Sequence, residues 1–155
     1  MAKINVDAEV KEGMRTGLGA VSRDENGEVL WCVAWQYREV LDPSSAEAMA
    51  ILLRLDEVRR MDRDRVIVES DCFTVIEALK QRKKSCSDLF LIFDDILHLC
   101  SLFRCVVWSF VSRDFNRVAH ELAHVSAWCL SRRFWSDSFP INVACCALTD
   151  RSLIY

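Results

Sequence analysis

The chain has 155 residues, of which 52% are hydrophobic, so it can bury one sizeable core but is short for two domains. Its net charge of −3 argues against a protein that holds nucleic acid by bulk positive charge, although bound divalent cations would offset acids locally. The longest uninterrupted apolar stretch, residues 29–35, is far below the roughly 18 residues of a membrane span, and no signal peptide opens the chain. We therefore expect an intracellular protein, in the nucleus or cytoplasm, with no membrane partner.

The eight cysteines carry no metal or disulfide signature. None belongs to a Cys-x-x-Cys pair, and most fall on apolar faces of the predicted elements. In a chain without a secretion signal, this pattern favours buried, reduced thiols.

Three extended segments are predicted before residue 37. Residues 3–7 alternate polar and apolar side chains and end on Asp7, and a glycine-spaced segment leads into residues 20–23. The turn at residues 24–27 contains an Asn-Gly pair, which accepts positive φ, and residues 28–36 complete a hairpin. We therefore expect three consecutive antiparallel strands.

A long helix is predicted to begin just after Pro43. Ser44 fits the N-cap position, and Glu47, three residues later, would complete a capping box. Apolar residues then recur at helical spacing as far as Val58. The following apolar run, residues 66–68, lacks polar alternation and indicates a strand covered on both faces.

The second half of the chain is predicted to be mainly helical. Helices are expected at residues 72–83, 89–102 and 116–129, with a fifth strand at residues 105–111. The order β-β-β-α-β-α-α-β-α predicts an α/β fold, a mixed five-stranded sheet flanked by helices. The C-terminal tail, residues 131–155, shows no clear periodicity and stays unassigned.

Three carboxylates lie at the ends of predicted elements. Asp7 ends the first strand, Asp71 follows the buried strand, and Glu47 opens the long helix. Taken singly, they have ordinary explanations as a turn residue, an N-cap and a capping-box partner. Ligands of open α/β sheets gather beyond the carboxyl ends of the strands, so together the three acids form a candidate two-metal phosphodiester site.

Five motifs, in this order and spacing, carry a resemblance to a known family. They are Ile4-Asn-Val-Asp7, Arg23-Asp-Glu-Asn-Gly-Glu-Val-Leu30, Ala46-Glu-Ala48, Val68-Glu-Ser-Asp71 and Arg113-Asp-Phe-Asn-Arg-Val-Ala-His120. The chain resembles the type 1 ribonuclease H superfamily, and more closely the reverse-transcriptase-like ribonuclease H domains of plant non-LTR retroelements. The resemblance implies a ribonuclease H-like domain over residues 1–130, with strand order 3-2-1-4-5.

The resemblance also implies an activity, the metal-dependent hydrolysis of the RNA strand of RNA–DNA hybrids. Asp7, Glu47 and Asp71 would be ligands of two magnesium (or manganese) ions, and His120 would complete the catalytic set. Magnesium prefers oxygen ligands, so a carboxylate cluster suits it and thiols would not.

His120 departs from the family pattern, because active members have an aspartate at this place. A neutral imidazole is a poor magnesium ligand and brings no negative charge. Three outcomes stay open: one metal is held more weakly, His120 takes part in proton transfer, or activity is lost. The last outcome would leave a nucleic-acid-binding relic of a retroelement domain.

Nucleic-acid contacts are expected from the polar segment that precedes His120. The chain has almost no insertion between its second and third helices, so it lacks the basic handle with which some family members grip the hybrid. Arg113, Asn116 and Arg117 are the candidate substrate-binding residues, and a monomer is expected.

A zinc hydrolase is the competing interpretation of the same helix. Residues 120–124 match H-E-x-x-H, in which two histidines on one helix face bind zinc and Glu121 would be the base. No glutamate follows Glu121, so only Asp137 or His98 could supply the third ligand.

Overall fold

The computed structural model describes residues 1–11, 15–126 and 132–151. Its elements, in chain order, are β1 (Ala2–Glu9), β2 (Thr16–Arg23), β3 (Val29–Tyr37), α1 (Pro43–Arg60), β4 (Arg65–Ser70), α2 (Phe73–Lys80), α3 (Asp88–Cys100), β5 (Cys105–Phe110), the 3₁₀ turn η1 (Arg113–Phe115), α4 (Arg117–Ser126), β6 (Arg133–Trp135) and α5 (Ile141–Arg151). The predicted end of the last helix, with Cys129, lies outside the described residues.

The strands form one mixed sheet in the order β5-β4-β1-β2-β3-β6. β4 runs parallel to both β1 and β5, whereas β1 with β2, β2 with β3 and β3 with β6 are antiparallel. The α/β class and the order of the first five strands are as predicted. The tail adds a sixth strand, β6, and the helix α5. Three residues are too few for alternation to reveal a strand in the sequence.

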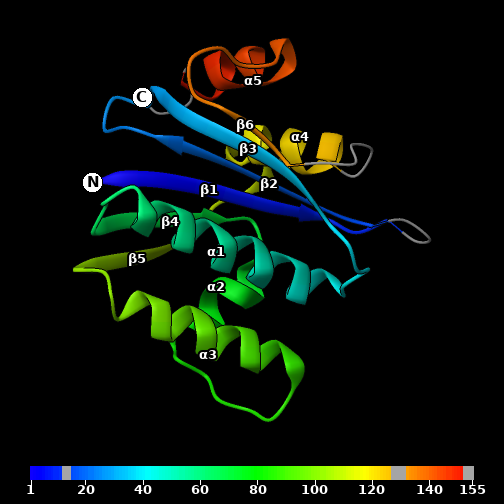
Figure 1. Cartoon of the computed structure of the whole chain (residues 1–155), viewed down its shortest axis with the longest axis vertical. Coiled ribbons are helices and arrows are strands. Elements are labelled where there is room, and N and C mark those ends of the chain that lie inside the picture. Colours follow the sequence, from blue (N-terminus) through cyan, green and yellow to red (C-terminus); the bar gives the residue numbers. More distant parts are fainter. Residues whose placement is uncertain (12–14, 127–131, 152–155) are drawn as a thin grey trace.

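Helices cover both faces of the sheet (Figure 1). α1, α2 and α3 pack over one face around a large apolar cluster that includes Ile51, Ile76 and Phe93. α4 and α5 lie on the other face, where Leu122 and Val143 join a smaller cluster. No helix in the described part of the chain is both long and apolar enough to span a membrane.

The N-terminus of α1 differs from the sequence prediction. Asp42, not Ser44, is the N-cap, and its side chain accepts a hydrogen bond of 3.1 Å from the Ser45 N–H. Pro43 occupies the first helical position, where its fixed φ fits and its missing N–H costs nothing. Glu47 is therefore no capping-box partner, and its carboxylate is available to the sheet.

Gly19 sets how closely α4 approaches the sheet. It lies opposite Asp7 in the β1–β2 register. A Cβ at this position would lie 2.3 Å from the Ala119 carbonyl oxygen and 2.4 Å from the Ala123 nitrogen. These are backbone atoms that cannot rotate away, so glycine is required for α4 to lie directly over β1 and β2.

We predict that Gly19→Ala destabilises the protein by about 1–3 kcal/mol or more, because overpacking a close contact forces the backbone to shift. The free energy of unfolding is measured by urea denaturation. Gly17→Ala, on the same strand, is the control for the loss of glycine itself. Equal stability of the two variants would contradict a close contact at Gly19.

Candidate metal centre

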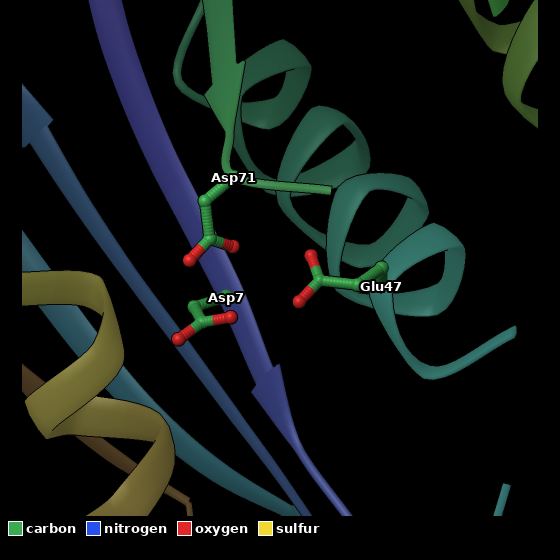
Figure 2. A group of neighbouring side chains, drawn as sticks. All are labelled: Asp7, Glu47 and Asp71. Carbon is green, nitrogen blue, oxygen red and sulfur yellow. The ribbon is translucent and has the colours of Figure 1, made fainter. Parts of the chain in front are cut away.

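Asp7, Glu47 and Asp71 converge at one end of the sheet. β1 and β4 are parallel, with Val6 opposite Ser70, so the chain reaches Asp7 and Asp71 side by side. Glu47 comes from the second turn of α1. The ligand oxygens of the three carboxylates all lie within 4.8 Å of one another, and the side chains face a common space (Figure 2). The convergence predicted from the sequence is present.

Two neutral donors hold the buried carboxylates. The Ala8 N–H donates to Oδ1 of Asp7 at 2.9 Å and to Oε1 of Glu47 at 3.0 Å. The Ser70 hydroxyl donates to Oε2 of Glu47 at 3.1 Å and accepts from the Cys72 N–H at 3.0 Å. These bonds link Glu47 to both β1 and β4, and they fix its carboxylate at the end of the sheet where the three acids meet.

The electrostatics of the cluster favour a bound cation. Burial, a hydrogen bond to Asp7 and the negative charge of Asp7 raise the pKa of Glu47 well above its ordinary value. Burial and the charge of Asp7 also raise the pKa of Asp71, while Arg113 opposes the shift. Three carboxylates with few donors fit a hard divalent cation that prefers oxygen ligands, such as Mg²⁺ or Mn²⁺.

His120 reaches this cluster from α4. Its Nδ1 lies 2.8 Å from Oδ2 of Asp7, the oxygen that the Ala8 N–H does not use. Of the three acids, Asp7 is the one to which His120 is hydrogen-bonded. His120 therefore acts on the cluster through Asp7.

The three candidate substrate-binding residues differ in their surroundings. Arg113 is 70% exposed, and its Nε donates to Oδ2 of Asp71 at 3.3 Å. Arg117 is exposed at the start of α4. Asn116 is buried, and its Nδ2 donates to the Val6 carbonyl at 2.8 Å, which ties the start of α4 to β1.

Two further contacts near the site were not predicted. Ser70 joins Glu47 to the start of α2, and His124 lies 2.8 Å, Nδ1 to Oε2, from Glu9. A signal for the second contact exists, because Glu9 follows Asp7 by two residues on a strand while His124 follows His120 by one helical turn. Neither spacing alone shows that the two pairs meet.

The zinc-hydrolase alternative lacks its third ligand. Among the described residues, Asp7, Glu47 and Asp71 are the one group of three or more potential metal-binding side chains, so neither Asp137 nor His98 completes a site with the two histidines.

The described cysteines form no disulfide with one another, and burial raises the pKa of Cys32 to about 12.

Residues 5–126 match the model of a protein family described as reverse transcriptase-like. The chain belongs to this family. The predicted superfamily is thereby confirmed at the level of the reverse transcriptase-like domain, while the plant retroelement origin stays a prediction. No curated protein sequence gives a significant match.

Solved structures show the fold of this reverse transcriptase-like domain. The N-terminal RNase H domain of Rv2228c from Mycobacterium tuberculosis is 22% identical, with a TM-score of 0.73 over 81% of this chain and 92% of that one. RNase H1 from Halobacterium salinarum is 17% identical, with a TM-score of 0.75 over 81% and 96%. LC11-RNase H1, isolated from compost by a metagenomic approach and crystallised with an RNA/DNA hybrid, is 21% identical, with a TM-score of 0.74 over 82% and 96%. The chain therefore has the ribonuclease H fold.

We predict that the metal-free protein loses stability as the pH rises above the ordinary carboxyl range. Because the pKa values of Glu47 and Asp71 are raised by folding, the folded protein keeps a proton that the unfolded chain has released, and raising the pH then favours unfolding. The free energy of unfolding is measured in a chelator from about pH 5 to about pH 8.

Glu47→Gln should flatten this pH dependence, whereas Asp137→Asn, at an exposed acid outside the cluster, should leave it unchanged. A saturating divalent cation should also flatten it, since the cation replaces the proton. Stability that increases over this pH range in the metal-free protein would contradict the prediction.

Proposed function

We propose that this protein is a metal-dependent ribonuclease H, which hydrolyses the RNA strand of RNA–DNA hybrids. The observation that carries the proposal is the convergence of Asp7, Glu47 and Asp71 toward the carboxyl ends of β1 and β4 within a ribonuclease H fold. The hybrid bound to the similar LC11-RNase H1 supports the choice of substrate.

Asp7, Glu47 and Asp71 would bind the divalent cations, Mg²⁺ or Mn²⁺. When bound, two such ions would supply activation of a water and charge stabilisation for an in-line displacement. The chain's own contribution is placement: Ala8 and Ser70 orient the acids, so that little reorganisation is needed when the ions bind. His120 would orient Asp7 by holding its Oδ2.

Two arginines would supply the positive charge that attracts the backbone of the nucleic acid. Arg113, which is hydrogen-bonded to Asp71, and Arg117, at the start of α4, are both exposed and would contact backbone phosphates. Asn116 would contribute indirectly, because its hydrogen bond to the Val6 carbonyl fixes the segment that carries both arginines. Local placement would thus compensate for the net charge of −3 of the chain.

A second candidate function is nucleic-acid binding without cleavage. It is favoured by one observation, the imidazole of His120 beside Asp7 where active members of the superfamily have an aspartate. A site with three acids instead of four would hold its cations more weakly and turn over slowly or not at all. The fold, together with Arg113 and Arg117, would still bind a hybrid.

We predict that the purified protein cleaves the labelled RNA strand of a hybrid in the presence of Mg²⁺ or Mn²⁺. Asp71→Asn should lower the rate at least about a hundredfold, the size of effect expected for loss of one preorganised electrostatic group. His120→Asp should raise the rate, because it restores a fourth carboxylate. The rate is read from RNA fragments on a gel, with chelator as the blank.

Asp137→Asn is the matched control and should cleave like the parent, because this acid is exposed and lies outside the cluster. Hybrid affinity, measured by fluorescence anisotropy in Ca²⁺, separates the two candidates. Tight binding with no cleavage by either the parent or His120→Asp would exclude the nuclease and leave the binding module.

A further inference from the structure

Two acid–histidine pairs stand side by side between β1 and α4. Asp7 and Glu9 point from the same side of β1, and His120 and His124 lie one turn apart on α4. In each pair, Nδ1 of the histidine lies 2.8 Å from a carboxylate oxygen. Glu9 is also held by Lys11, whose Nζ lies 3.6 Å from its other oxygen. The nuclease proposal uses the first pair and leaves the second without a role.

The pairs determine which ring nitrogen carries the proton. An ionised carboxylate only accepts hydrogen bonds, so the proton of each pair lies on Nδ1. In the neutral form of a ring held in this way, the lone pair is on Nε2, the nitrogen that the carboxylate does not contact. The side chains of His120 and His124 are 32% and 46% exposed, so neither ring is enclosed by the protein.

This arrangement is the one that metal-binding histidines have in proteins. Their second ring nitrogen is almost always bonded to a carboxylate, carbonyl or water, which fixes the tautomer and makes the ligating nitrogen more basic. Two histidines four residues apart on a helix face are also a known pair of ligands for one ion. Here both features occur together, on the same two residues.

We propose that His120 and His124 form a two-histidine site for a borderline transition-metal ion, Zn²⁺ in the first place, bound through both Nε2 atoms. Imidazole suits Zn²⁺ and disfavours Mg²⁺, so the two histidines would take a different ion from the three carboxylates, although Asp7 belongs to both groups. Asp7 and Glu9 are its positioning residues. Two protein ligands leave the other coordination positions to water, so the site is open rather than structural. The proposal does not depend on nuclease activity.

The test is nitrogen-15 NMR of the histidine rings, which resolves each nitrogen of the three histidines in the chain. Without metal, His120 and His124 should both show a protonated Nδ1 and an unprotonated Nε2. On addition of Zn²⁺, the two Nε2 resonances should shift together, and those of His98 on α3 should stay in place. Mg²⁺ should shift neither Nε2.

Affinity is taken from the same resonances, because the eight cysteines could also bind zinc and would confuse a calorimetric measurement. Glu9→Gln should weaken zinc binding about tenfold or more, the usual cost of losing an outer partner of a ligand. His124→Gln should abolish the shift at His120, and His98→Gln is the matched control with no effect.

Three results would overturn the proposal. The first is a proton on Nε2 and none on Nδ1 in the neutral form of either histidine of the metal-free protein. The second is a zinc-induced shift confined to His120, which would place the ion among the carboxylates. The third is a shift at His120 that persists unchanged in His124→Gln. None of these results depends on whether the protein cleaves a hybrid.

Discussion

The parallel pairing of β1 with β4 is the constraint on which the site depends. Its register sets Val6 opposite Ser70, so each strand delivers its acid at the same level, and the Ser70 hydroxyl is left to hold Glu47 from α1. Side chains alternate between the two faces of a strand, so a slip of one residue would turn Asp7 toward the opposite face. The geometry of the three carboxylates is therefore a property of the sheet, and it exists before any ion arrives.

Burying these carboxylates close together destabilises the folded protein. Asp7 and Glu47 are buried side by side, with the Ala8 N–H shared between them and the Ser70 hydroxyl as a further donor. The apolar clusters on both faces of the sheet have to offset this repulsion. A divalent cation removes the conflict, which links ion binding to stability as well as to chemistry.

Much of the fold could be predicted because the decisive signals are local. The buried run at residues 66–68, the Asn-Gly turn and the acids at strand ends each follow from a few neighbouring residues. What escaped prediction depends on distant or unusual contacts. α2 ends at Lys80 through Arg82, which adopts a φ of 49° without the glycine that usually marks such an end. The pairing of Glu9 with His124 joins residues 115 positions apart, and the spacing within each element does not by itself show that the two residues meet.

The short strand β6 protects the outer edge of β3. It pairs with residues 32–34 of β3, and Phe134 stacks on Trp31 with ring centroids 5.8 Å apart. Without β6, the backbone donors and acceptors along this edge would be open to another chain, which is how exposed edges start aggregation. A recombinant fragment that ends near residue 130 would keep every proposed catalytic side chain and yet leave residues 32–34 of β3 open to pairing with another chain.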